Sequence, residues 1–375
     1  MAESPFVRLA ETLDTDALGV PKRDGGFSPA FLEYLRLLFT AEEAEAASHL
    51  NVAPPFRSVQ EVAGEMGHSA EEVQELLDGL ASRNLLIGGG GSYVLPNMRL
   101  VVNYHQLREE TGKDDIDAGK LYQKFFIEDG FYRFYQSSAA GTPMRRAIPI
   151  GESIADEQKV LSHEEIDSVL DGIEGGFMAQ VPCPCRVRTE KLGIRECKDE
   201  HPVASCLFVG NMARAAVGLG WGKQISPEDV KKYVEETREM GLVMMVDNHL
   251  GFDDGIICFC CGCCCSTSRG ITRWDNPHAF ARSDFVARVS DECVTCGNCV
   301  DACMFDAISL EEDADMAVVD ETRCMGCGVC TVTCSSESLK LYRLEREPIF
   351  ESEDIMMEKV ARENLAAGQT RLRRD

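Results

Sequence analysis

The chain has 375 residues, with 63 aspartates and glutamates against 38 lysines and arginines. This acidic balance disfavours nucleic acid and anionic membranes as partners and suits solubility or docking to a basic patch on another protein. No run reaches the ~20 apolar residues of a membrane helix, and the first residues lack the basic start and apolar run of a signal peptide. We therefore predict a cytoplasmic protein of two or three domains without membrane association, whose 18 cysteines are metal ligands rather than disulfides.

The first hundred residues predict an irregular arm followed by a small domain of helices and one hairpin. Residues 1–27 are expected to be the arm, because they end in a turn-forming Asp-Gly-Gly run. Further on, the glycines at 88–91 separate two short apolar stretches, as in a β-hairpin. Helices followed by a hairpin resemble a winged-helix domain, which we place at residues 28–100. Its helices are predicted to begin at four N-cap residues: Ser28, Thr40, Ser58 and Ser69.

The charge of this winged-helix-like domain bears on DNA binding. Residues 28–100 hold ten acids and four lysines or arginines, and in the helix predicted to begin at Ser69, Arg83 alone opposes a run of acids. Contacts to the phosphates of DNA need positively charged side chains instead. We therefore predict a protein-interaction or dimerisation module rather than a DNA reader. The acids of that helix are Glu71, Glu72, Glu75 and Asp78.

The middle of the chain divides into two predicted parts. Residues 101–165 form an aromatic-rich connector, expected to be core that packs the two halves together, with an aromatic-lined cofactor pocket as the alternative. Residues 166–283 are predicted to be a helical, cysteine-rich domain, because helix-start signals and apolar stripes recur along it. Within that domain, residues 242–246 predict one buried strand. The connector's aromatic residues are Phe125, Phe126, Phe131, Tyr132, Phe134 and Tyr135.

Ten cysteines of the middle region fall into two groups along the chain. Either group can supply the four thiolates that a cubane cluster or a structural zinc ion requires. We favour at least one further iron–sulfur cluster, built by both groups or by each separately, with zinc and thiol–disulfide chemistry as the alternatives. The first group is Cys183, Cys185, Cys197 and Cys206; the second is Cys258, Cys260, Cys261, Cys263, Cys264 and Cys265.

Adjacent cysteines of the second group cannot all face one metal. Alternate residues of an extended segment share a face, so two sets are expected unless a loop around Gly262 breaks the alternation. Beside the first group, Arg186 and Arg188 either raise the potential of a cluster, hold an anionic substrate, or pair with acids at the surface. The two expected faces carry Cys261, Cys263 and Cys265, and Cys258, Cys260 and Cys264.

Residues 284–345 contain two cysteine runs with the same spacing, C-x2-C-x2-C-x3-C. Three cysteines at steps of three wrap a loop around a cubane cluster, and the fourth thiolate arrives from elsewhere. Short strands are predicted at residues 307–310, 316–319 and 339–342. The runs are Cys293, Cys296, Cys299 and Cys303, then Cys324, Cys327, Cys330 and Cys334.

This double spacing resembles the two-cluster 4Fe–4S ferredoxins. The resemblance implies a ferredoxin-like fold and two 4Fe–4S clusters, with the fourth cysteine of each run ligating the other cluster. The chain departs from the family where Met304 and Ser335 replace the usual proline after each run. The implied ligand sets are Cys293, Cys296 and Cys299 with Cys334, and Cys324, Cys327 and Cys330 with Cys303.

The order of the motifs carries a second resemblance. From Cys-x-Cys-Arg through CxCCxCCC to the ferredoxin runs, residues 145–345 resemble a group of prokaryotic iron–sulfur proteins, which implies a metal site but supplies no reaction. Residues 346–375 predict a helical tail. The predicted fold class is thus α+β multidomain, with a winged-helix-like N-terminal domain, a helical cysteine-rich middle and a ferredoxin-like dicluster C-terminal domain.

These features predict an electron carrier or oxidoreductase subunit rather than a stand-alone enzyme. An anaerobic cell is the expected setting, because exposed clusters are sensitive to oxygen. The sequence carries no nucleotide- or flavin-binding motif, so the expected partner is a protein, namely a flavoprotein or another reductase. Two alternatives remain: a redox-sensing regulator with the winged helix as its output, and a central cysteine site that is itself catalytic.

Overall fold

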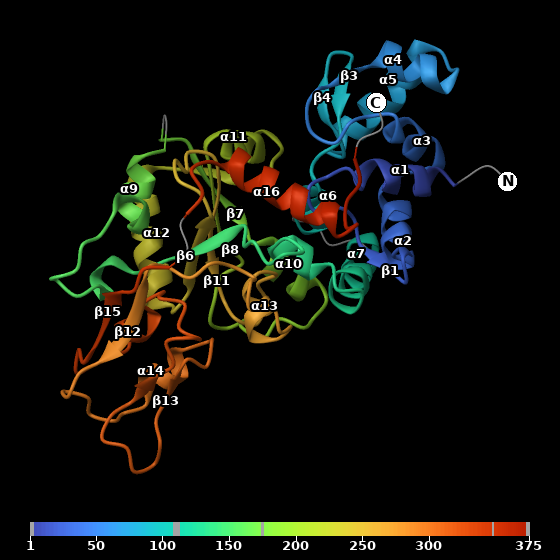
Figure 1. Ribbon diagram of the computed structural model, residues 1–375. Coiled ribbons are helices and arrows are strands. Elements are labelled where there is room, and N and C mark those ends of the chain that lie inside the picture. The colour runs from blue at the N-terminus through green and yellow to red at the C-terminus, as the bar shows by residue number, and fades with distance from the viewer. Residues whose placement is uncertain (1–3, 108–112, 174–175, 347–348, 373–375) are drawn as a thin grey trace. The chain divides into compact units, whose positions relative to one another are not determined.

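Two compact units make up the computed structural model of the chain (Figure 1). The first comprises Met1–Thr142 with Met357–Asp375, and the second comprises Pro143–Met356. Both helix and sheet are present, as predicted. Within the described ranges, no helix is long and apolar enough to cross a membrane. These ranges are residues 4–107, 113–173, 176–346 and 349–372.

The first unit is mostly helical. Helix α1 buries Leu9, Ala10 and Leu13 inside the segment predicted to be an irregular arm, so that prediction is wrong. The three- and four-residue spacing of these apolar side chains was the available signal for a helix. The helices are α1 (Pro5–Leu13), α2 (Pro29–Leu38), α3 (Ala41–Ser48), α4 (Val59–Met66), α5 (Ala70–Ser82), α6 (Met98–Asn103), α7 (Lys113–Tyr122) and α8 (Tyr132–Gln136), with the 3-10 turn η1 (Tyr104–Leu107) and the π-helical turn η2 (Gln123–Glu128).

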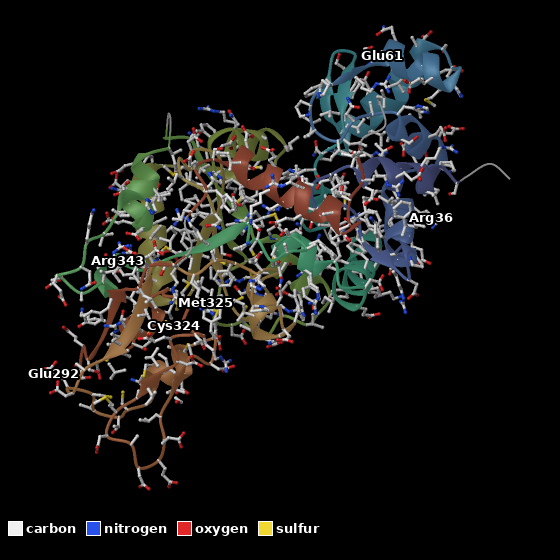
Figure 2. The ribbon with its side chains drawn as sticks, in the orientation of Figure 1. Arg36, Glu61, Glu292, Cys324, Met325 and Arg343 are labelled. Carbon is white, nitrogen blue, oxygen red and sulfur yellow. The ribbon has the colours of Figure 1, made fainter. Side chains whose placement is uncertain are left out.

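Capping boxes begin three helices of this unit. In α3, α4 and α5 the N-cap hydroxyl accepts a backbone hydrogen bond, and the glutamate three residues on accepts one from the N-cap N–H. Glu61, which is labelled in Figure 2, makes this contact with the Ser58 N–H at 2.7 Å. The strands are β1 (Lys22–Arg23) with β2 (Gly26–Phe27), and β3 (Arg57–Ser58), β5 (Ser92–Val94) and β4 (Ile87–Gly89) in that sheet order.

The expected hairpin is therefore present as β4 and β5, directly after α5, the helix predicted to begin at Ser69. The winged-helix assignment itself stays a prediction. At the other end of the chain, helix α16 (Glu353–Ala366) forms where a helical tail was predicted.

The aromatic residues of the predicted connector fill the core of the first unit. The ring of Phe125 lies edge-on to Phe31 and Tyr34 of α2, with centroids 5.6 and 5.3 Å apart. Tyr122 stacks on Phe126 with centroids 4.4 Å apart. The segment is thus core, as predicted, and it packs against α2 of its own unit. The division between the units falls after residue 142, inside the predicted connector.

A six-stranded antiparallel sheet organises the second unit, where the sequence predicts a helical domain. That part of the fold prediction is wrong, because several strands are short buried apolar runs whose periodicity does not distinguish a strand from a buried helix. The buried strand predicted at residues 242–246 is confirmed as β10. In sheet order the strands are β6 (Arg145–Ile148), β10 (Val243–Asp247), β11 (Gly255–Cys260), β8 (Ala204–Val209), β7 (Met178–Pro182) and β9 (Lys223–Ile225).

Short and medium helices connect these strands. Helix α10 begins at Pro184, so the Cys-x-Cys motif lies at its start, and α13 follows the CxCCxCCC run. The bounds are η3 (Gly151–Ser153), η4 (Ser162–Glu164), α9 (Ile166–Asp171), α10 (Pro184–Lys191), α11 (Gly210–Gly218), α12 (Pro227–Glu239) and α13 (Ser268–Thr272).

The region of the two ferredoxin-type runs repeats one local structure twice. Helices α14 (Asn298–Ala302) and α15 (Val329–Val332) follow glycines with left-handed backbone, Gly297 at φ 81° and Gly328 at φ 82°. The three predicted strands are confirmed. They are β13 (Ile308–Ser309) and β14 (Val318–Val319), which pair antiparallel with each other, and β15 (Leu339–Arg343), which pairs antiparallel with a fourth strand, β12 (Phe285–Val289).

Candidate metal centres

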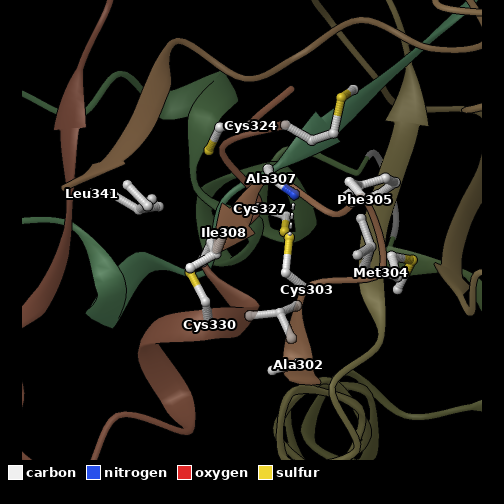
Figure 3. A pocket seen from close by; sticks show the side chains of 15 residues that line it. Ala302, Cys303, Met304, Phe305, Ala307, Ile308, Cys324, Cys327, Cys330 and Leu341 are labelled. Atoms are coloured by element: carbon white, nitrogen blue, oxygen red, sulfur yellow. Dashed lines mark hydrogen bonds between the residues drawn. The ribbon is translucent and has the colours of Figure 1, made fainter. Parts of the chain in front are cut away.

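Cysteines from both ferredoxin-type runs share one cavity (Figure 3). Cys324, Cys327 and Cys330 of the second run line it together with Cys303, the last cysteine of the first run. The Ala307 backbone N–H donates a hydrogen bond to Cys303 Sγ at 3.4 Å. Apolar side chains complete the walls, among them Ala302, Met304, Phe305, Ile308 and Leu341.

A second cavity has the reciprocal composition. Cys293, Cys296 and Cys299 of the first run line it together with Cys334, the last cysteine of the second. The Sγ atom of Cys334 lies 3.4 Å from the Ser338 hydroxyl, within hydrogen-bond distance. The fourth cysteine of each run thus lies beside three cysteines of the other run, which is the grouping that the ferredoxin resemblance implies. Ligation of a cluster by these two sets stays a prediction.

The chemistry of these cavities fits cationic metal centres. Burial raises the pKa of Cys327 to about 12, and it also raises the pKa of Cys303 and Cys330. The thiolate forms at neutral pH therefore need a positive centre beside them. Each cavity offers the four cysteine donors that a 4Fe–4S cluster takes.

Four central cysteines converge more tightly, and we call them the four-thiol set. The Sγ atoms of Cys197, Cys261, Cys263 and Cys264 all lie within 4.8 Å of one another. Four of the separations are 3.8, 3.7, 3.6 and 3.5 Å. A tetrahedral ion with metal–sulfur bonds of about 2.3 Å requires sulfur–sulfur separations of about 3.8 Å. The four-thiol set therefore has the dimensions of a site for a single ion, whereas a cubane spreads its thiolates over four irons.

Both sequence groups contribute to the four-thiol set. Cys261, Cys263 and Cys264 come from the turn that follows β11, and Cys197 comes from the loop between α10 and β8. The Thr189 hydroxyl donates to Cys264 Sγ at 3.3 Å. Cysteines of both groups therefore lie together in this set, and the metal that they are expected to hold stays a prediction.

The other six central cysteines contact one another in a closed ring, which we call the six-thiol ring. The Sγ atoms of two members, Cys260 and Cys265, are 3.1 Å apart. In order of contact, the ring comprises Cys183, Cys185, Cys265, Cys260, Cys258 and Cys206, which again contacts Cys183.

The turn at Gly262 decides which cysteines share a face. Cys258 and Cys260 both belong to the six-thiol ring, as strand alternation predicts. Cys264 and Cys265 are exchanged relative to the prediction, since Cys264 joins the four-thiol set and Cys265 joins the ring. The reason is that β11 ends at Cys260 and residues 262–264 form a turn, so strict alternation stops there.

Arg186 and Arg188 are buried beside these thiols, each with 1% of its surface exposed, so the prediction that they pair with surface acids is wrong. Both belong to a stretch of α10, residues 186–189, that is buried on all sides. The guanidinium of Arg186 donates to the Phe259 carbonyl oxygen at 3.3 Å. Burial opposes the positive charge of Arg186, but the thiolates of Cys183 and Cys261 outweigh it and raise the pKa of this guanidinium.

The four-thiol set adjoins the dicluster region. A Cβ atom built on Gly262 would lie 3.3 Å from Cβ of Met304, the residue that follows Cys303. One continuous apolar core contains Phe305 from the dicluster region and Cys261 from the four-thiol set. The Cys303 cavity and the four-thiol set are therefore separated by packed side chains rather than by solvent.

Comparison with known proteins identifies the dicluster region. Residues 292–338 match the family model of the 4Fe–4S dicluster domain. An archaeal-type glutamate synthase (NADPH) of Dehalococcoides mccartyi is 34% identical over 61 residues, which cover 16% of this chain and only 12% of that protein. No solved structure matches the chain significantly. The chain thus contains a 4Fe–4S dicluster domain, which supports iron–sulfur electron transfer, and the winged-helix prediction is left without confirmation.

Proposed function

We propose that this chain, which carries a 4Fe–4S dicluster domain at residues 292–338, is an electron-transfer protein or the electron-transferring subunit of a redox enzyme. The observation that carries the proposal is the exchange of Cys303 and Cys334 between the two cysteine runs, which forms two four-cysteine cavities. Each cavity is inferred to hold one 4Fe–4S cluster, and a bound cluster accepts and returns a single electron.

The residues around each cavity give the two clusters different surroundings. Cys296 is exposed, and Val294 beside it is 60% exposed, so the rim of the first cavity faces solvent. Phe305 and Met325 bury the Cys303 cavity, each with 3% of its surface exposed. We infer that a partner exchanges electrons at the open cavity, and that the Cys303 cavity passes them towards the four-thiol set.

The four-thiol set is inferred to bind one tetrahedral ion, either zinc or iron. Sulfur separations of 3.5–3.8 Å support a single ion over a third cubane cluster. A single iron in four thiolates adds a redox step next to the dicluster region, whereas zinc, which has no redox chemistry, makes the site structural. The metal content of the purified protein decides between them.

The inferred partner is a flavoprotein or another reductase, because the sequence carries no nucleotide- or flavin-binding motif of its own. The net charge of −25 suits docking to a basic patch on that partner. A winged-helix-like domain at residues 28–100 is the proposed docking module. The alternative of a redox-sensing regulator has no support from the comparisons. A cytoplasmic location in an anaerobic cell stays a prediction.

The test is a count of iron, zinc and acid-labile sulfide on protein purified without oxygen, together with EPR of the reduced form. We expect about eight irons with matching sulfide from the dicluster domain and at least one further ion from the central cysteines. Cys197→Ser serves as the control, because it alters the four-thiol set and leaves both dicluster cavities unchanged. A folded protein with about four irons or fewer, or one without a 4Fe–4S signal, contradicts the proposal.

A further inference from the structure

The six-thiol ring lies outside both dicluster cavities and outside the four-thiol set, and these sets together account for all 18 cysteines. We propose that the six-thiol ring is a polynuclear metal–thiolate centre that holds at least two metal ions. This inference goes beyond the electron-transfer role and does not depend on which partner supplies electrons.

Separate parts of the chain build the ring. Cys206 of β8 and Cys258 of β11 are directly opposite each other in the antiparallel register. Side chains at such positions lie next to each other on one face of the sheet. Cys260 follows two residues after Cys258 and therefore shares that face. The remaining members come from the start of α10 and from the turn after β11: Cys183, Cys185 and Cys265.

The ring is compact and largely removed from solvent. The Sγ atoms of Cys260 and Cys265 are 3.1 Å apart, Cys206 lies opposite Cys258, and Cys185 accepts a hydrogen bond from the residue that follows Cys265. Cys185 and Cys258 are half-buried, so these two members keep partial exposure to solvent. The remaining members are at most 6% exposed: Cys183, Cys206, Cys260 and Cys265.

Six thiolates exceed the number that one ion accepts. A tetrahedral zinc or iron ion binds four thiolates, so six ligating sulfurs require at least two ions. A sulfur with a neighbour on each side is placed to bridge two adjacent ions, and a ring of such sulfurs can hold a cluster of them. The four-thiol set, with four mutually close sulfurs, suits one ion instead.

Hydrogen-bond donors point at the ring sulfurs. The Ser266 backbone N–H donates to Cys185 Sγ at 3.2 Å. The backbone N–H groups of Thr267 and Ser268 donate to Cys265 Sγ at 3.3 and 3.4 Å. Each of these two sulfurs therefore accepts backbone hydrogen bonds of the kind that metal-bound thiolates accept, and such bonds tune the centre that they surround.

Two arginines bring positive charge to the ring. The Arg145 guanidinium donates to Cys258 Sγ at 3.4 Å. Arg186, which is almost fully buried, interacts electrostatically with Cys183 of the ring and with Cys261 of the four-thiol set. A buried guanidinium needs negative charge close by. Metal-bound thiolates supply that charge at neutral pH, whereas protonated thiols do not.

The test counts metal on the full-length chain purified without oxygen. Iron, zinc and acid-labile sulfide are measured on the wild type, on Cys260→Ser in the six-thiol ring, and on Cys197→Ser in the four-thiol set. EPR of the reduced dicluster domain reports separately on the proposed function and on folding. We expect Cys260→Ser to lose at least two ions and Cys197→Ser to lose about one, with the dicluster signal retained in both.

Unchanged metal content in Cys260→Ser, in protein that retains the dicluster signal, would overturn the proposal. Cys185→Ser is the second variant in case Cys260→Ser does not fold, because Cys185 is half-buried at the start of a helix. We expect Cys185→Ser also to lose at least two ions. Unchanged metal content in this folded variant would likewise overturn the proposal.

Alkylation of the wild-type protein provides a measurement that needs no substitution. Cys185 and Cys258 are the half-buried members of the ring, so burial alone does not shield them. We expect both to resist alkylation until a metal chelator is added. Alkylation of these two cysteines without a chelator would show that they are free thiols. Alkylation that requires only a reductant would show that they form disulfides. Either result overturns the proposal.

Discussion

The dicluster region and the central cysteine region both gather thiols, but they do so by different means. In the dicluster region three cysteines of each set lie on one loop, at steps of three residues, and a single cysteine crosses over from the other run. In the central region the four-thiol set and the six-thiol ring each draw on both groups of the sequence. Local loops group thiols in the first region, whereas segments far apart in the sequence bring them together in the second.

The two regions also differ in the spacing of their sulfurs. Among the described residues, which include every cysteine, the four-thiol set alone brings four ligand atoms within 4.8 Å of one another. The dicluster cysteines instead surround cavities with apolar walls. A cavity leaves room for a cluster with its own sulfide ions, whereas converging sulfurs leave room for one ion. Similar ligands thus predict different cofactors in the two regions.

The largest expected effect comes from removing a cysteine that crosses between the dicluster runs. Cys303→Ser should lose the cluster held with Cys324, about four of about eight irons, because each cubane needs four thiolates. The reduced protein should then show one EPR centre, and Cys324→Ser should leave the same centre. If Cys303→Ser instead leaves the same EPR centre as Cys293→Ser, each run keeps its own fourth cysteine and the crossed grouping is wrong.

Arg186 tests whether the central thiols carry negative charge. Arg186→Met should lower the free energy of unfolding by about 3–5 kcal/mol, because it leaves the buried thiolates without their guanidinium. Chemical denaturation without oxygen measures this change. Lys232→Gln is the control, since its side chain is 77% exposed and its loss should change stability by less than about 0.5 kcal/mol. Equal stability of the two variants would mean that the thiols near Arg186 are uncharged.

A pair of glycines tests how strictly the dicluster loops are held. Gly326, at φ +66°, has the Phe285 carbonyl oxygen 2.3 Å from where a Cβ atom would lie, whereas Gly297, at φ +81°, has open space. Gly297→Ala should cost about 1–2 kcal/mol for its left-handed backbone. Gly326→Ala should cost more, because the backbone must also move, and it should weaken iron binding at the Cys303 cavity. Equal iron retention and stability in both variants would contradict this.

The smallest expected effect concerns the reduction potential of one cluster. Burial tends to raise the pKa of Cys334, but bonds from Ser338 and Ser336 outweigh it, so the pKa of this thiol is lowered. Ser338→Ala removes one donor to sulfur and should lower the potential of the Cys334 cluster by a few tens of millivolts, since such bonds stabilise the reduced form. The Cys303 cluster of the same protein is the internal control in an EPR-monitored titration. A shift of both clusters would indicate a general structural change.

Much of the fold could be predicted where local rules suffice. The capping boxes at Ser58 and Ser69, the hairpin after them and the strands beside the cysteine runs follow from short-range patterns. Helix α1 was missed although its apolar spacing indicated it. The central sheet was missed because short apolar runs such as residues 204–209 occur in both buried strands and buried helices.

Sequence spacing was sufficient to predict the dicluster region, because steps of three residues place three thiols on one loop whatever the rest of the chain does. The central cysteines needed the tertiary structure. Cys206 and Cys258 meet because β8 pairs with β11, and Cys264 and Cys265 part because the turn after β11 ends the strand's alternation. Such contacts depend on which strands become neighbours and in what register, and no local pattern in the sequence encodes that.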